Sequence, residues 1–230
     1  MRTHHLIIFL ITITLQTLNS SAIKYQVIND APNTPGGSRF NSKIGTRYTL
    51  QIMQSINFAV WNIFQQYNYS DRKNVKIIKV FIQQYKDNGD EAFTSGDNIN
   101  VSASYLASYR GDDLRRDFTG LLHHEMTHVL QSLERNVPEG LIDGVAEYIK
   151  LKLSYNQKSF AKRGDGTRWD QGYDITARFL EYCDELKPGF VAELNKMMKF
   201  DYSDSYFEKL TGKSVGLLWG DYKAKYRSRG

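Results

Sequence analysis

The chain has 230 residues, a formal net charge of +5 and one cysteine. One cysteine excludes an intrachain disulfide, so a chain of this length has to depend on a buried core for its stability. The excess of basic residues is modest and acidic residues are scattered along the chain, so the charge does not indicate specific nucleic-acid recognition.

The first 22 residues have the pattern of a secretory signal peptide. Arg2 gives a positive start, an apolar run covers residues 6–15, and small residues at 20–22 offer a cleavage site after Ala22. The run is too short to span a bilayer, and no later stretch is apolar enough to do so. We therefore predict a leader at 1–22 and one secreted domain at 23–230, with no membrane attachment once the leader is removed.

Two smaller features also bear on the secreted setting. Asn68 and Asn100 each begin an Asn-X-Ser triplet, the acceptor pattern for N-linked glycans. Cys183 lies in the apolar segment 179–183, where we expect a buried thiol rather than a reactive one.

Strands are predicted mainly in the N-terminal half of the chain. Residue alternation, helical spacing and turn residues indicate, in chain order, a strand at 24–28, a loop at 30–45, a helix at 46–66, a strand at 75–84 and a strand at 99–105.

The C-terminal half is predicted to be mostly helical. Apolar spacing indicates helices at 117–135, 141–153, 171–186, 190–200, 203–210 and 215–225. Pro138 and Gly140 separate the first of these helices from the second. Strands followed by helices are typical of an α+β fold, here with a mixed or antiparallel sheet packed beside the helix at 117–135.

The histidines outside the leader all fall within residues 123–128, and residues 124–128 read His-Glu-Met-Thr-His. On a helix, His124 and His128 lie one turn apart on the same face, so both imidazoles can bind one zinc ion. Glu125 lies beside them, where it can take a proton from water. His123 points about 100° away from His124, so we expect it to pack or to support the site from outside.

The third ligand is predicted to be a carboxylate on the next helix. Asp143 and Glu147 are four residues apart and therefore share a face. We prefer Asp143 as the zinc ligand and keep Glu147 as the alternative. The acid that does not bind zinc can orient a ligating histidine. Gly144 and Ala146 are small enough to let the two helices approach closely.

Such a site would hydrolyse peptide bonds. Three protein ligands leave one zinc position for water, whose pKa falls toward neutrality, and Glu125 can then act as the general base. The predicted strand at 99–105 offers an edge for an extended peptide substrate. Tyr173 or Arg178 is a possible donor to the developing oxyanion, with ordinary structural hydrogen bonding as the alternative for both.

Several ordered segments resemble the plant basic secretory protein family. The strongest are residues 124–129, 138–148 and 168–180, and shorter matches occur at 35–40, Asn195, 210–213 and 218–219. The resemblance implies a zincin-like fold and zinc bound by His124 and His128, with Glu125 as the base. It also implies secretion to the apoplast or cell wall and an association with defence. The pI near 9.1, by itself, is compatible with weak binding to acidic cell-wall polymers.

The chain departs from the family pattern at the third ligand. The family usually has Glu before the glycine and Asp four residues later, whereas Asp143 precedes Gly144 here and Glu147 follows. Two functions are therefore considered: a secreted zinc endopeptidase, or a defence-related binding or signalling protein on a weakly active or inactive zincin scaffold. The presence of Glu125 favours the endopeptidase, because retention of a metal does not require a base.

Overall fold

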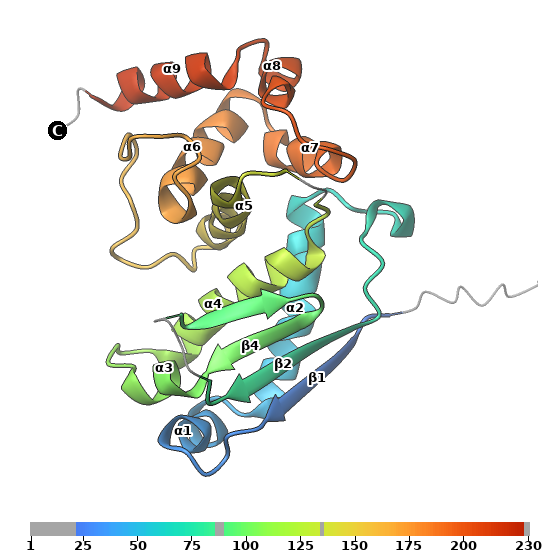
Figure 1. The fold of residues 1–230 in the computed structure, drawn as a ribbon, viewed down its shortest axis with the longest axis vertical. Coiled ribbons are helices and arrows are strands. Elements are labelled where there is room, and N and C mark those ends of the chain that lie inside the picture. The colour runs from blue at the N-terminus through green and yellow to red at the C-terminus, as the bar shows by residue number, and fades with distance from the viewer. Residues whose placement is uncertain (1–21, 86–89, 134–135, 228–230) are drawn as a thin grey trace, which may run out of the picture.

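The computed structural model describes residues 22–85, 90–133 and 136–227. Its described part contains a mixed sheet in the order β1-β2-β4-β3 (Figure 1). The strands are β1 (Lys24–Asn29), β2 (Ile77–Gln83), β3 (Ala92–Ser95) and β4 (Asn98–Ser102). The first three strands of the sheet are parallel, and β3 pairs antiparallel with β4.

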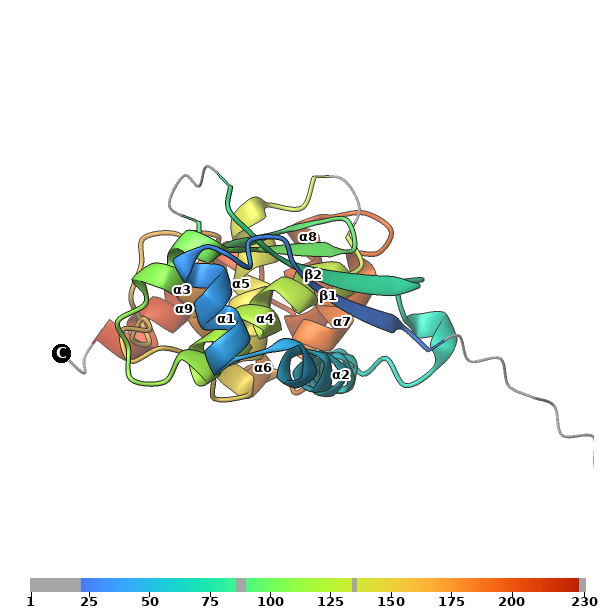
Figure 2. The ribbon, with the colours of Figure 1, turned by 90° about the horizontal axis from the view of Figure 1, so that it is seen from below.

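One face of the sheet is buried beneath two long helices. Ile78, Val80 and Ile82 of β2 alternate with half-buried residues and are fully buried themselves, as expected for a strand with one face in the core. Helices α2 (Thr46–Ile63) and α4 (Leu114–Leu130) cover that face, as Figure 2 shows. The predicted packing of the sheet beside the helix that carries residues 124–128 is therefore confirmed.

The predicted loop at 30–45 is wrong, because residues 35–43 form helix α1 (Pro35–Lys43). Thr34 caps its first turn by accepting a hydrogen bond from the Gly37 N–H, and proline starts the helix. The glycines that suggested a loop instead permit close packing: a Cβ on Gly36 would lie 1.8 Å from the carbonyl oxygen of Ala103.

The predicted strand at 99–105 is also partly wrong. It ends at Ser102, whose side chain accepts a hydrogen bond from the Tyr105 N–H and starts helix α3 (Ala103–Ser108). The prediction also missed β3 and the short 3₁₀ helix η1 (Tyr69–Asp71). A four-residue strand gives too short an alternation to be recognised from its sequence.

The predicted helices of the C-terminal half are confirmed, with ends that differ by a few residues. They are α5 (Glu139–Lys152), α6 (Tyr173–Leu186), α7 (Phe190–Met197), α8 (Ser205–Thr211) and α9 (Val215–Arg227). Helix α5 packs on α4 and α6, and α6 packs on α7 and α9, so these helices form a second layer beside the sheet (Figure 1). The α+β class is confirmed.

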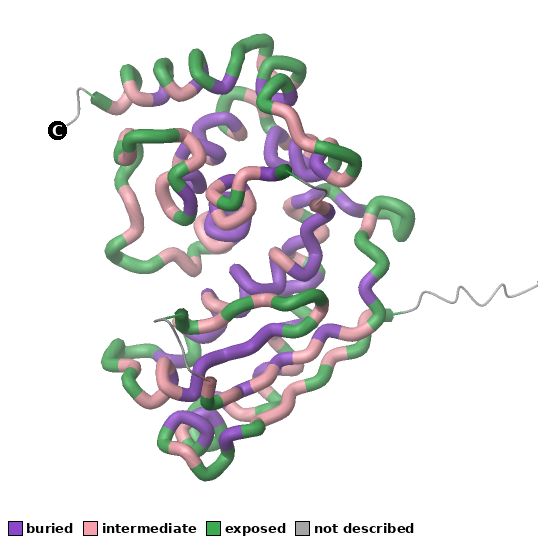
Figure 3. The backbone as a smooth tube through the Cα atoms, viewed as in Figure 1, coloured by how far each residue is buried: buried purple, intermediate pink, exposed green. Residues whose placement is uncertain are grey.

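Glycines of α5 decide how this layer packs. A Cβ on Gly144 would lie 2.2 Å from Cγ2 of Thr176, and one on Gly140 would lie 2.0 Å from the carbonyl oxygen of Asp170. Gly144 therefore brings α5 close to α6, whereas we had predicted that it would let α5 approach α4. Buried residues run along α4 and α5, where the two helix layers meet (Figure 3).

Three further predictions concern residues away from the site. Cys183 is fully buried, as expected, and burial raises the pKa of its thiol. Asn68 is exposed, whereas Asn100 lies in the interior strand β4 and is only 9% exposed, so a glycan is sterically compatible with Asn68 alone. Residues 1–21 of the predicted leader lie outside the described residues. Within the described part of the chain, no helix combines the length and apolarity needed to cross a bilayer.

Candidate metal centre and active site

The two histidines of the motif converge as predicted. His124 and His128 lie one turn apart on α4, and their Nε2 atoms are 2.9 Å from each other. Helix α5 packs against α4 and brings Asp143 to the same point, with Oδ1 at 3.8 Å from His124 Nε2 and 3.5 Å from His128 Nε2. Among the described residues, these three form the group of His, Cys, Asp and Glu side chains able to hold a metal ion.

The donor set fits zinc. Tetrahedral zinc with bonds of about 2.0–2.1 Å places its ligand atoms roughly 3.3 Å apart, which is close to the three separations between His124, His128 and Asp143. Burial lowers the pKa of His128 to about 4, so its imidazole is neutral at neutral pH, as metal binding requires. Two histidines and one carboxylate are also a ligand set of catalytic zinc sites, which keep a position for water.

Glu147 contacts the opposite side of His124. Its Oε1 lies 2.9 Å from His124 Nδ1, and Lys150 donates to the same oxygen at 2.8 Å. Burial alone would raise the pKa of Glu147, but the contacts with His124 and Lys150 outweigh it, and the pKa is lowered. The geometry thus separates the two carboxylates between which the sequence left a choice: Asp143 faces the Nε2 atoms, and Glu147 faces Nδ1.

His128 has a buried polar neighbour of its own. Its Nδ1 is buried and makes no hydrogen bond of normal length, and both polar side-chain atoms of Gln131 are likewise buried and unpaired. The Gln131 side chain raises the pKa of His128 against the larger effect of burial. We had not singled out Gln131 from the sequence, although it lies three residues after His128.

Glu125 is held by a residue of the strand that the sequence analysis missed. Its side chain is buried, and the Thr94 hydroxyl of β3 donates to Oε2 at 2.7 Å. Burial raises the pKa of the Glu125 carboxyl, with smaller opposing effects from His124 and Thr94. A carboxylate with a raised pKa beside the metal ligands is suited to accept a proton.

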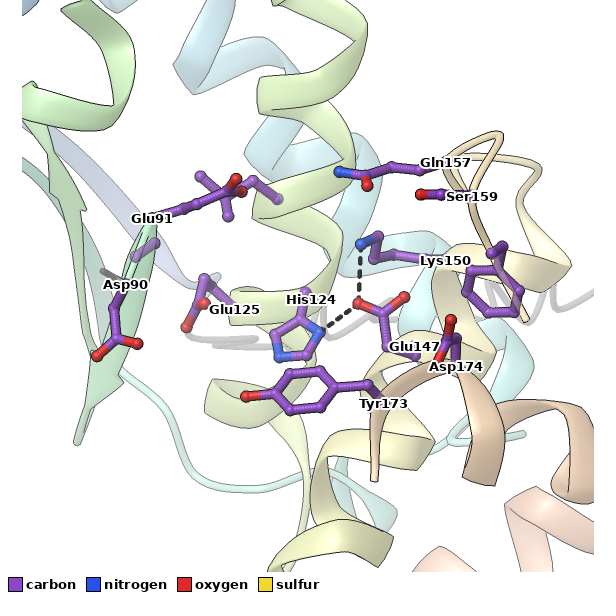
Figure 4. A pocket seen from close by; sticks show the side chains of 13 residues that line it. Asp90, Glu91, His124, Glu125, Glu147, Lys150, Gln157, Ser159, Tyr173 and Asp174 are labelled. Carbon is purple, nitrogen blue, oxygen red and sulfur yellow. Dashed lines mark hydrogen bonds and ion pairs between the residues drawn. The ribbon is translucent and has the colours of Figure 1, made fainter. Parts of the chain in front are cut away.

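His124, Glu125 and Glu147 line a cleft of about 380 Å³ together with Lys150 and Tyr173 (Figure 4). The ring of Tyr173 stacks on His124, with ring centroids 6.0 Å apart and an angle of 14° between the planes. Tyr173 has φ +44°, a left-handed conformation that is strained for a non-glycine residue. Neighbouring carboxylates, Asp143 first, raise the pKa of its hydroxyl, so it is protonated and able to donate a hydrogen bond.

The other predictions for the site have mixed outcomes. Arg178 donates to the Ala161 carbonyl and pairs with Glu181, so its role is structural. His123 stacks on Tyr155 and does not belong to the group of possible metal ligands. Strand β4 is not an edge, because it is flanked by β2 and β3; the edge beside Glu125 is β3, which the sequence analysis missed.

Comparisons with known proteins agree with the predicted resemblance. The family model described as "Peptidase of plants and bacteria" matches residues 20–222. A protein from Boswellia serrata named "Basic secretory protease" is 44% identical over 62 residues, which is 27% of this chain and 72% of that protein. No solved structure matches the chain. Since the family model covers most of its length, the chain belongs to the family of peptidases of plants and bacteria.

Proposed function

We propose that this protein is a zinc-dependent endopeptidase in which His124, His128 and Asp143 hold the metal. The observation that carries the proposal is the convergence of three donor atoms within 4.8 Å of one another, directly beside the buried carboxylate of Glu125. When bound, zinc would polarise the scissile carbonyl and lower the pKa of water. Membership of a peptidase family supports a peptide or protein as the substrate.

Each remaining step is assigned to a side chain that lines the cleft or contacts one that does. Glu125 takes the proton of the attacking water and passes it to the leaving amine. Thr94 fixes the direction of the Glu125 carboxylate through its 2.7 Å hydrogen bond. Tyr173 holds a protonated hydroxyl at the exposed side of His124, where it can donate to the oxyanion. The extended substrate pairs with β3, since β3 is the edge of the sheet that lies beside Glu125.

Glu147 supports the site without binding the metal in this proposal. Its contact with His124 Nδ1 fixes the ring so that Nε2 faces the ion, as carboxylates commonly do for ligating histidines. Lys150 compensates the charge of Glu147 at 2.8 Å. The exchange of Asp and Glu relative to the family pattern thus leaves one carboxylate on each side of His124.

Measurements on the purified protein test the proposal. We expect about one zinc per chain by atomic absorption, and cleavage of an unfolded protein substrate that stops when a chelator removes the metal. Glu125→Gln should keep the zinc and lose about 10²- to 10⁴-fold in kcat. Equal cleavage by the variant and the parent would overturn the role of Glu125. Zinc binding without cleavage by either protein would support the alternative of a binding or signalling protein.

We also propose that residues 1–22 direct export and that the mature domain at 23–230 acts in the apoplast or cell wall in defence. The leader pattern, the family and the name of the Boswellia relative support this setting. Sequencing the N-terminus of protein recovered from the extracellular fluid tests it. A chain that begins at residue 23 is expected, and retention of the full chain inside the cell would contradict it.

A further inference from the structure

The cleft beside the metal centre has two opposite walls. The start of β3 and the two residues before it form one wall, and the first turn of α6 and part of the loop before it form the other. Figure 4 shows Asp90 and Glu91 on one side of His124 and Asp174 on the opposite side. An extended substrate that pairs with β3 would therefore pass between these carboxylates.

Acidic side chains predominate among the described residues that line the cleft. Lys150 is the one lysine or arginine among them, and it donates to Glu147 at 2.8 Å, so its charge is balanced. Bound zinc would add two positive charges, which Asp143 and Glu125 would offset. The other acids of the lining make no ion pair within the described part of the chain: Asp90, Glu91 and Asp174. The cleft thus keeps an excess of negative charge even when zinc is bound.

These three acids do not form a second metal site. In the part of the chain that the structure describes, the proposed zinc ligands are the group whose atoms lie close enough to share one ion. The acids of the cleft are instead spread over its walls, with Asp90 and Glu91 before β3 and Asp174 in the first turn of α6. The Ala161 N–H donates to Oδ2 of Asp174 at 2.8 Å and fixes its position. Separated carboxylates of this kind suit the long, flexible side chain of an organic cation.

Two of these acids act on groups near the metal centre. Asp143 first, then burial and Asp90, raise the pKa of the Tyr173 hydroxyl, so Asp90 lies within electrostatic reach of Tyr173. Partial burial and the carboxylate of Asp117 raise the pKa of Glu91. A positive charge placed between such neighbouring acids relieves their mutual repulsion.

The cleft also offers apolar surface for the methylene groups that carry such a cation. Ala92 of β3, Leu121 of α4 and Phe160 of the loop before α6 all line it. Lysine and arginine combine an aliphatic stem with a charged end, so either can bury its stem on these residues while its charge faces the acids. An acidic substrate side chain would find no unpaired lysine or arginine among the described lining residues.

The excess of acidic residues continues beyond the cleft. A cavity of about 580 Å³ adjoins it, since Gln157 and Ser159 line both. In this second cavity the charged residues of the described lining comprise three acids and two bases: Asp112, Asp113, Arg116, Asp117 and Lys158. A substrate that extends from the cleft into the cavity therefore meets the same sign of charge.

We propose that the cleft selects substrates that carry a lysine or arginine close to the scissile bond. This preference rests on the proposed peptidase function, whose substrate class it defines. Asp90, Glu91 and Asp174 would surround the charged end of that side chain, and the apolar residues of the cleft would contact its stem.

The test measures binding of end-blocked peptides to the Glu125→Gln variant in zinc-containing buffer, by titration calorimetry. Three matched peptides of alanine and glycine carry lysine, glutamine or glutamate at every third position, so that one such side chain can enter the cleft in any register. We expect the lysine peptide to bind about tenfold more tightly than the glutamine peptide, and the glutamate peptide to bind most weakly. Added salt should reduce this preference, because the acids lie at the surface of a cleft that is open to solvent.

Substitutions of single acids then identify the source of the preference. Glu91→Gln, added to the Glu125→Gln chain, should lower the ratio of lysine-peptide to glutamine-peptide affinity about threefold. Combining it with Asp90→Asn should remove most of the preference. Glu208→Gln is the matched control, because Glu208 is exposed and lines neither cavity. It changes the net charge by the same amount as Glu91→Gln and should leave the ratio unchanged.

Equal binding of the lysine and glutamine peptides would overturn the proposed preference, as would failure of all three peptides to bind at millimolar concentration. The same holds if Glu91→Gln and Glu208→Gln change the affinity ratio equally. Cleavage by the parent chain separates this preference from the peptidase function. Selective binding of the lysine peptide without any cleavage would overturn the peptidase function alone. Chelator-sensitive cleavage of an unfolded protein with no enrichment of lysine or arginine at the cleaved sites would overturn the preference alone.

Discussion

Oε1 of Glu147 lies 2.9 Å from Nδ1 of His124, while Nε2 of the same ring faces His128 and Asp143. One imidazole therefore lies between the two carboxylates that the sequence places four residues apart. Removing the carboxylate of Asp143 should therefore have a different effect from removing that of Glu147.

Asp143→Ala should weaken zinc binding more than Glu147→Gln does. In the proposed site, loss of Asp143 removes a ligand, whereas loss of a carboxylate that only orients a ligating histidine costs about 10- to 100-fold in affinity. Competition with a chromophoric chelator measures the zinc affinity of both variants. If Glu147→Gln loses more zinc affinity than Asp143→Ala, Glu147 is the ligand and Asp143 is the orienting carboxylate.

Thr94→Val should lower kcat about tenfold without changing the zinc content. The substitution preserves the shape of the side chain but removes the 2.7 Å hydrogen bond that orients the carboxylate of Glu125. Thr94→Ser keeps the hydroxyl and should restore most of the rate. Equal kcat for the valine and serine variants would show that the hydrogen bond has no role in positioning the base.

Tyr173→Phe should lower kcat about 10- to 100-fold and leave KM nearly unchanged. The ring can still stack on His124, so only the hydroxyl that would donate to the oxyanion is lost. Steady-state kinetics on a defined peptide separate the two constants. An increase in KM with kcat unchanged would assign Tyr173 to substrate binding instead.

Gly144→Ala should destabilise the fold by about 1–3 kcal/mol, because the added Cβ would lie 2.2 Å from Cγ2 of Thr176. Thr176→Ser in the same chain removes that methyl group and should recover part of the loss. Gly216→Ala is the control, since nothing lies within 4 Å of its added Cβ and α9 should gain up to about 1 kcal/mol from it. Urea unfolding of the four proteins measures these differences, and equal stability of Gly144→Ala and Gly216→Ala would contradict the close contact between α5 and α6.

Acid should weaken the packing around Glu181. Burial alone would raise the pKa of this carboxyl, but hydrogen bonds from Arg163 and Arg178 outweigh it, and the pKa is lowered from 4.5. A lowered folded-state pKa stabilises the protein above pH 4.5, and that contribution is lost as the pH falls through the folded value. Glu181→Gln should therefore cost about 1 kcal/mol at pH 7 and flatten the fall in melting temperature below pH 4.5.

The control for the acid experiment is Glu208→Gln. Glu208 is exposed and makes no ion pair within the described part of the chain. Its variant should follow the melting curve of the parent from pH 7 to pH 3. If Glu181→Gln follows the same curve as well, the ion pairs of Arg163 and Arg178 do not contribute to acid sensitivity.

The sequence by itself determined those features that depend on local spacing. The distance of four residues between His124 and His128 places both imidazoles on one helix face whatever surrounds them. The apolar periodicity of the long helices located α2 and α4 to α6 within a few residues. The α+β class followed from the order of these elements.

Only the tertiary structure separated Asp143 from Glu147, because their sequence spacing gives both acids the same helix face. Their different contacts depend on how α5 packs against α4, and α5 also packs closely on α6, where Gly144 meets Thr176. The same holds for Thr94: β3 is too short to show a periodic pattern, and its pairing with β4 brings a distant residue to Glu125. Contacts of this kind join residues far apart in the chain, so no local sequence pattern predicts them.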